Sequence, residues 1–317
     1  MLSRVFQEHP RLPPNVSYCC HLLRLYGLEP FRHPVFSSGS EVVSVLTDQA
    51  LSKEFFGEPI FFRTRSGIRY QDPATQKERT GENHRDICLA TFAELGLPLT
   101  TPVTTEDASF TLADLLRDSV ENFDIKQDEL AWTAVAYAIY LPQRQWSNRY
   151  GESFSFDDVA DALMSTRFED ASCGGTHLLY ALTVLLRAKG SADGLSEPVH
   201  YELSQYLQRR SIAAIQSQAG DGSWDLNWHA APNNDASSDA LLPPSTADFN
   251  RLLVTGHLLE WLELLPEEIQ PPHDVYMQAA RWLCNSLAST SVASLRNFCP
   301  VVHAQLAARA LIDDVGG

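Results

Sequence analysis

Residues 173–182 read Cys-Gly-Gly-Thr-His-Leu-Leu-Tyr-Ala-Leu, a glycine turn followed by a histidine-led apolar helix. Glycine suits a tight turn, and the apolar residues after it recur at helical spacing. A histidine therefore stands in the first turn of a predicted helix. Five other apolar helical segments also start at a chemically capable residue, and these residues are His21, His84, Glu129, His257 and His303.

Other helical segments, which start at plain Ser or Thr residues, lie between these six. Residues 109–116 read Ser-Phe-Thr-Leu-Ala-Asp-Leu-Leu, and residues 153–160 read Ser-Phe-Ser-Phe-Asp-Asp-Val-Ala. Their hydroxyls can cap the first free amides, and carboxylates favour the positive end of a helix. Together the patterns predict helices over roughly 83–96, 110–122, 128–141, 155–167, 175–188, 196–217, 250–265, 272–288 and 293–313.

The rest of the chain contributes one expected β element and one long loop. Residues 60–70 hold two β-prone runs around Ser66-Gly67, which predicts a short hairpin. Residues 221–248 lack helical periodicity and contain a Pro243-Pro244 pair. A loop of that length in a compact domain is usually functional or mobile.

Strict alternation of histidine-led and hydroxyl-capped helices predicts the fold class. We expect an all-α fold with a single domain over 1–317, an α/α toroid of about five or six helix pairs, and a small β-hairpin near 60–70. The histidine-led helices would form the inner layer and gather their first residues around one mouth. The alternative is an open helical array, in which those residues would not converge.

Composition narrows the environment and the partners. The net charge of -16 argues against nucleic acid and against anionic membranes, which attract basic patches. No apolar run reaches the ~20 residues of a membrane span, and the first ten residues lack the apolar core of a signal peptide. We therefore expect a cytoplasmic protein whose six cysteines are reduced thiols.

One turn carries a resemblance to a known family. Residues 218–224, Gln-Ala-Gly-Asp-Gly-Ser-Trp, fit the pattern Gln-x-x-x-Gly-x-Trp. The pattern resembles the repeat motif of the terpenoid cyclase and protein prenyltransferase toroid superfamily. The resemblance implies a toroid in which Gln218 and Trp224 tie the end of an outer helix to the next turn. Neither the Asp-x-Asp-Asp motif of the cyclases nor the Asp-x-Cys of the prenyltransferases is present, so the resemblance implies no substrate.

Two Cys-x-x-x-His pairs are the candidate metal ligands. Cys173 with His177, and Cys299 with His303, each stand four residues apart, so each pair can share a helix face. Sulfur and nitrogen ligands of this kind suit zinc. The alternative is a pair of inert buried cysteines beside histidines that hydrogen-bond to carbonyl groups. Residues 157–161, Asp-Asp-Val-Ala-Asp, align with a capped helix start and are better explained as first-turn charges.

The remaining candidates are catalytic and substrate-binding residues. Several imidazoles at one mouth can act as acids, bases or ligands, whereas a lone histidine at a helix start is usually structural. The candidate catalytic residues are His84, Glu129, His177, His257 and His303. The candidate substrate-binding residues are Gly174 and Gly175 (with free amides at a helix start), Trp132, and Trp228 with His229 as a lid.

The leading functional hypothesis is an enzyme that performs acid–base chemistry on a small polar or saccharide-like substrate in a central cavity. The second hypothesis is a toroid enzyme that handles isoprenoids, with or without zinc at Cys173, His177, Cys299 and His303. The third is a non-catalytic toroid that binds a peptide or protein. The sequence leaves the cofactor, the reaction and the oligomeric state open.

Overall fold

The computed structural model describes residues 15–31, 35–71, 82–189, 194–230 and 244–289. The predicted helix over 293–313, with Cys299 and His303, lies outside these residues. Within the described ranges the protein is mostly helical, which confirms the expected all-α class.

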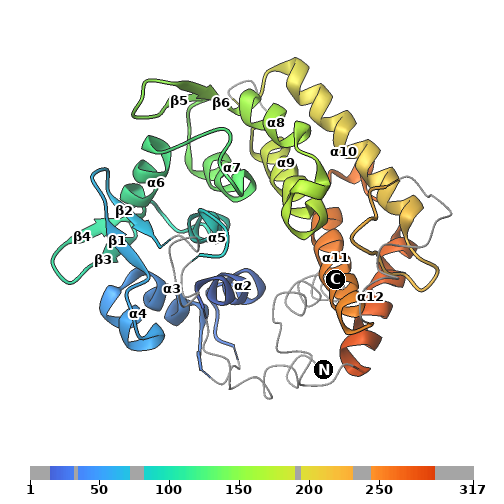
Figure 1. The fold of residues 1–317 in the computed structure, drawn as a ribbon, viewed down its shortest axis with the longest axis horizontal. Helices are drawn as coiled ribbons and strands as arrows, with labels where there is room; N and C mark the ends of the chain where they lie inside the picture. Colours follow the sequence, from blue (N-terminus) through green and yellow to red (C-terminus); the bar gives the residue numbers. More distant parts are fainter. Residues whose placement is uncertain (1–14, 32–34, 72–81, 190–193, 231–243, 290–317) are drawn as a thin grey trace.

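The helices form an inner and an outer layer, and the chain passes from one to the other in turn (Figure 1). Each inner helix packs against the next inner helix along the chain. The inner helices are α2 (Val16–Tyr26), α5 (Ile87–Glu94), α7 (Leu130–Tyr140), α9 (Thr176–Lys189) and α11 (Pro244–Leu264). The outer helices are α3 (Gly39–Thr47), α4 (Gln49–Phe56), α6 (Leu112–Glu121), α8 (Phe156–Ser165), α10 (Glu197–Ser217) and α12 (His273–Ser289).

The two layers follow from the distribution of apolar residues. The inner helix α7 is apolar around its circumference, and every residue from Leu130 to Ala138 is buried. The outer helix α6 has an apolar face built on Leu112, Leu115 and Leu116, with charged residues between them. A helix apolar all round must be covered on every side, whereas an amphipathic helix covers others and faces water. None of the described helices has the length and hydrophobicity that a membrane crossing needs.

Three antiparallel hairpins accompany the helices. The pair β1 (Phe61–Arg63) and β2 (Ile68–Tyr70) confirms the expected hairpin. The pairs β3 (Pro102–Thr104) with β4 (Ser109–Thr111), and β5 (Gln145–Ser147) with β6 (Ser153–Ser155), were not predicted. In both of these, the second strand runs directly into an outer helix. Each of these strands has three residues, and the hydroxyl residues at the ends of β4 and β6, Thr111 and Ser155, cap the helix that follows.

The outer helices α6 and α8 begin with the predicted hydroxyl caps. Thr111 and Asp114 form a reciprocal capping box at α6, and Ser155 and Asp158 form the same box at α8. Asp157, beside Asp158, forms an ion pair with Arg144. Two of the three carboxylates in the Asp-Asp-Val-Ala-Asp segment therefore have partners at the start of α8, as expected for charges in a first helical turn.

Two helices begin earlier than the sequence suggested. Helix α11 starts at Pro244 rather than near residue 250, because proline fits the first position of a helix. Helix α2 starts at Val16, and the Asn15 side chain caps it by accepting a 2.8 Å bond from the Tyr18 amide. His257 and His21 therefore lie inside their helices. The prediction that they stand at helix starts was wrong.

The turn with the Gln-x-x-x-Gly-x-Trp pattern ties helix α10 to helix α12. Gln218 follows α10 and donates to the carbonyl oxygens of Gly222 (3.0 Å) and Val275 of α12 (2.9 Å). Trp224 is fully buried, and its indole N–H donates to Ala214 O of α10 at 2.7 Å. Gly222 has a φ of 96°, and a Cβ there would lie 2.5 Å from the Gln278 carbonyl oxygen. The turn therefore requires glycine at this position.

Candidate functional site

Three predicted residues meet at the start of the inner helices. Glu129 immediately precedes α7, and its carboxylate lies 3.2 Å from His84 Nδ1 through Oε1 and 3.7 Å from His177 Nδ1 through Oε2. The His84 and His177 rings stand edge to face, with centroids 4.9 Å apart. Ser172 Oγ also donates to Glu129 Oε1. One carboxylate therefore lies next to two imidazoles from other parts of the chain.

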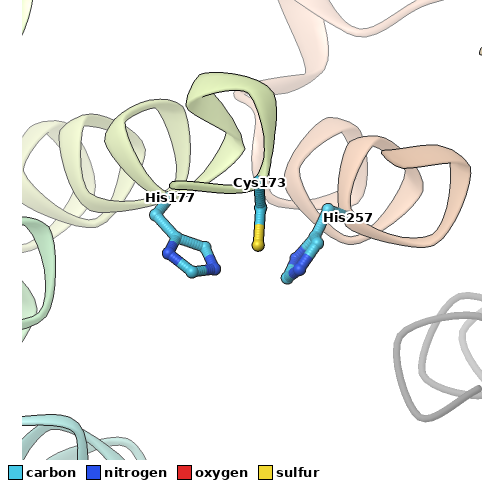
Figure 2. A group of neighbouring side chains, drawn as sticks. All are labelled: Cys173, His177 and His257. Atoms are coloured by element: carbon cyan, nitrogen blue, oxygen red, sulfur yellow. The ribbon is translucent and has the colours of Figure 1, made fainter. Parts of the chain in front are cut away.

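Cys173 and His257 extend the cluster. The His257 and His177 ring centroids are 5.0 Å apart. The Cys173 sulfur and one nitrogen from each of the two rings lie within 4.8 Å of one another. Figure 2 shows the three side chains pointing into the same space from the α9 and α11 segments. The structure therefore brings together His84, Glu129, Cys173, His177 and His257, and Cys299 and His303 lie outside its described residues.

Backbone strain gathers at the starts of consecutive inner helices. Among the described residues, the non-glycine residues with positive φ are Asp86 (60°), Glu129 (57°) and Cys173 (54°). Each immediately precedes an inner helix or the turn that leads into one. The left-handed conformation costs such residues about 1–3 kcal/mol, and it persists where the surroundings hold it, often at functional sites. Two of these residues belong to the cluster.

The cluster combines an ionised carboxylate with a neutral imidazole. Burial, together with the neighbouring His257 and His84, lowers the pKa of His177 to about 3 against the opposing effect of Glu129. Burial alone would raise the pKa of Glu129, but hydrogen bonding to His177 and His84 brings that pKa well below its ordinary value. At neutral pH we therefore expect Glu129 to be charged and His177 to be uncharged.

Two cavities share Glu129 in their walls. One cavity of about 670 Å³ is lined by Glu129 and His177 together with residues of α8 and the turn at Ser172. The other, of about 630 Å³, is lined by Glu129, Asp86 and polar residues near α6. Both volumes suit a small molecule. The cluster therefore has room for a substrate beside it.

A buried network of charged residues lies next to the cluster, and it was not predicted from the sequence. Arg24 of α2 forms ion pairs with Glu94 of α5 at 3.1 Å and with Glu260 of α11 at 2.7 Å. Its guanidinium also lies over the rings of Trp132 and Tyr180, 4.8 and 4.7 Å from their centroids. A single side chain thus touches the four other inner helices. The sequence signal for this network was a single arginine within the apolar run of an inner helix.

The charged network and the cluster are joined through His257. Glu260 lies one turn after His257 on α11, and its Oε2 is 3.6 Å from His257 Nδ1. Its other oxygen, Oε1, pairs with Arg24. The i, i+3 spacing of His257 and Glu260 could have revealed this contact from the sequence.

No family model, curated protein or solved structure gives a significant match to this chain. The resemblance carried by residues 218–224 therefore stays a prediction. Function has to be argued from the site, because a fold alone assigns no chemistry.

The predicted substrate-binding glycines have a packing role. A Cβ on Gly175 would lie 2.3 Å from the Phe168 ring, so the close approach of Phe168 requires glycine there. The Gly174 carbonyl accepts a 3.1 Å bond from the Trp228 indole, which is buried beneath the turn. These contacts fix the turn that presents Cys173. Binding of an anion by the turn's amides stays a prediction.

The two remaining predicted residues lie at different distances from the cluster. Trp132 is buried, and its ring centroid is 5.1 Å from that of His177, so it forms part of the cluster's wall. His229 stands against the Phe168 ring and lies 3.9 Å from Glu169. Its partners thus belong to the turn that carries Phe168.

A buried acid at the start of α5 gives a pH-dependent prediction. Glu82 Oε1 accepts a 2.8 Å bond from the Cys88 amide, and burial, with the charge of Asp86, raises the pKa of Glu82 to about 8. Because the pKa of Glu82 is higher in the folded state than in the unfolded state, protonation of Glu82 stabilises the fold, and it does so fully below the unfolded-state pKa. This stabilisation is lost as the pH rises through 8. We expect Glu82→Gln to gain about 2–4 kcal/mol of unfolding free energy relative to wild type between pH 5 and pH 8.

Urea unfolding of both proteins at the two pH values measures this gain. Glu106→Gln, at an exposed glutamate, is the control and should show no gain. An equal stability difference between Glu82→Gln and wild type at both pH values would contradict the prediction.

Proposed function

We propose that this chain is an α/α-toroid enzyme that performs general acid–base chemistry on a small polar or saccharide-like substrate. Its catalytic residues would be His84, Glu129, His177 and His257. The observation that carries the proposal is the position of Glu129, within 4 Å of two imidazoles and on the wall of two cavities. Such a group of titratable side chains beside a cavity is the usual basis for an active-site hypothesis.

The toroid is supported by the inner and outer layers and by one long-range contact. The first and last described inner helices, α2 and α11, are linked by the ion pair of Arg24 with Glu260. The chain segments that carry them are far apart in sequence. A ring that closes between these helices explains why a charged pair is buried there.

Each member of the cluster has a chemical role in the proposal. Glu129 orients the Nδ1 proton of the imidazoles, so that the other ring nitrogen can exchange a proton with a substrate. His84 and His177 offer two such nitrogens side by side. A pair of neighbouring imidazoles can supply the acid and the base of one reaction.

A polar substrate is favoured over an isoprenoid by the polarity of the larger group of residues around one cavity. Charged side chains, among them Arg69, Asp86 and Asp118, line the cavity of about 630 Å³. A polyprenyl chain requires an apolar wall, because charged groups lose hydration against it. Hydroxyl and carboxylate groups of a substrate can instead use the existing charges.

The test is turnover of a panel of glycosides, uronate oligosaccharides and small esters. We expect Glu129→Gln to lower kcat about 100- to 10,000-fold on any substrate that the wild type converts, since it removes the group that orients both imidazoles. Glu202→Gln, at an exposed residue of the outer helix α10, is the matched control. Equal rates for Glu129→Gln and wild type, including no turnover by either, would contradict the proposal.

A further inference from the structure

We propose that Cys173, His177 and His257 bind one zinc ion. Their ligand atoms lie within 4.8 Å of one another and come from the α9 and α11 segments (Figure 2). One sulfur with two nitrogens is a ligand set that zinc accepts, and three protein ligands leave a position for water or substrate. The sequence had paired Cys173 and His177 with other ligands. The structure places His257 beside them.

The spacing of the ligand atoms is close to what zinc requires. Zinc bonds of about 2.0 Å to nitrogen and 2.3 Å to sulfur put tetrahedral ligand atoms about 3.3–3.7 Å apart. The cluster would have to contract by roughly 1 Å, which small side-chain rotations supply. Both histidines are almost fully buried, so few alternative rotamers compete with the binding geometry.

A carboxylate behind each histidine is the second observation. Glu129 lies 3.7 Å from His177 Nδ1, and Glu260 lies 3.6 Å from His257 Nδ1. Histidine ligands of metals commonly donate their other ring N–H to a carboxylate, which fixes the tautomer and leaves the second nitrogen for the ion. Glu129 and Glu260 stand beside two different histidines at distances slightly beyond hydrogen-bond range, so a small rotation of each ring would complete this arrangement.

The strained turn gives the third observation. Cys173 holds a φ of 54°, and Gly174 and Gly175, packed on Leu226 and Phe168, fix the chain after it. A cysteine gains nothing in packing from a left-handed backbone, which costs about 1–3 kcal/mol. The strain is explained if it aims the sulfur at the two imidazoles.

The ligand chemistry decides between this site and a second group of three residues. His84, Glu129 and His177 also lie within 4.8 Å of one another. However, Glu129 Oε1 already accepts a hydrogen bond from Ser172, and both of its oxygens face Nδ1 atoms. The group with Cys173 contains a thiolate, which zinc binds more strongly than hard ions such as magnesium do.

A bound zinc ion would take up the free ring nitrogens of His177 and His257, so in the zinc-bound protein the proton transfer of the proposed function would fall to His84 with Glu129. Zinc binding can be measured without a substrate, so the two proposals are tested separately. Full-length protein, stripped with a chelator, is titrated with ZnCl2 in competition with a chromophoric chelator, and metal content is measured after dialysis. We expect about one zinc per chain and a rise in melting temperature with zinc. Cobalt substitution should give a thiolate-to-metal charge-transfer band.

Variants locate the ion. Cys173→Ser should remove the cobalt band, and both Cys173→Ser and His257→Gln should weaken zinc binding by at least about 100-fold. Glu260→Gln, which removes only the carboxylate behind His257, should weaken it about 10- to 100-fold. Cys284→Ser and His200→Gln, on the outer helices α12 and α10, are matched controls and should bind zinc as the wild type does.

Two outcomes would overturn the zinc site. The first is a folded wild type that shows neither retained zinc nor micromolar binding. The second is a Cys173→Ser variant with unchanged affinity and an unchanged cobalt spectrum. Circular dichroism of each variant separates lost binding from lost folding, and the wild-type cobalt band stays decisive if a variant does not fold. If Glu129→Gln loses turnover but keeps the zinc content of the wild type, the result supports only the catalytic proposal.

Discussion

Arg24→Met is expected to lower the free energy of unfolding by about 3–5 kcal/mol at pH 7. The substitution keeps an unbranched apolar stem but removes the guanidinium, which leaves Glu94 and Glu260 buried without their cation. The loss of one partner of a buried ion pair is costly, because the remaining charge has neither water nor a counterion. The contacts of the guanidinium with Trp132 and Tyr180 are lost as well. Urea unfolding measures the effect, provided that the unfolding free energy depends on urea concentration with the same slope in both proteins.

The pH dependence of this loss identifies its cause. Burial raises the pKa of Glu94 even in the wild type, where Arg24 opposes the shift. Without Arg24 the Glu94 carboxyl group takes up a proton more readily in the folded state, so the deficit should shrink as the pH falls from 8 towards 5. Arg24→Met combined with Glu94→Gln and Glu260→Gln is the control and should recover much of the stability. A deficit that is constant with pH would show that packing, not charge, is responsible.

The helices were predictable because their signals are local. Apolar periodicity and hydroxyl caps placed α6 and α8 within two residues of their observed bounds. The hairpins before them were missed, because three-residue strands leave no measurable alternation and their hydroxyls resemble plain caps. The early start of α11 was missed because Pro243-Pro244 suggested a loop, although proline also suits the first turn of a helix.

The candidate site was predictable only in part. His84, Glu129 and His177 stand at or just before inner helices, so a layer that aligns those starts brings them together. His257 joins them from within α11, which the helix-start argument did not anticipate. Arg24 was not found, because its partners are on α5 and α11, and no local pattern shows which distant helices meet.

Trp224→Ala is expected to cost about 3–5 kcal/mol of unfolding free energy, the range for a buried aromatic reduced to alanine. Trp224 is 1% exposed, its indole N–H bonds to Ala214 O, and its amide donates to Thr255 Oγ1 of α11 at 3.0 Å. The substitution leaves a cavity between the outer helix α10 and the inner helix α11, and Ala214 O loses its indole donor. Thermal and urea unfolding measure the loss.

Two further variants separate cavity formation from the loss of the indole bond. Trp224→Phe fills most of the space but cannot donate to Ala214 O, which keeps its 3.2 Å bond from Ser217 Oγ, so it should cost about 0.5–1.5 kcal/mol, the loss of one hydrogen bond. Trp282→Ala, at a half-buried tryptophan of the outer helix α12, should cost less than Trp224→Ala. Equal costs for Trp224→Ala and Trp282→Ala would show that Trp224 does not hold the layers together. A large difference would support a structural role for the turn at residues 218–224, in which Trp224 is fixed on both α10 and α11.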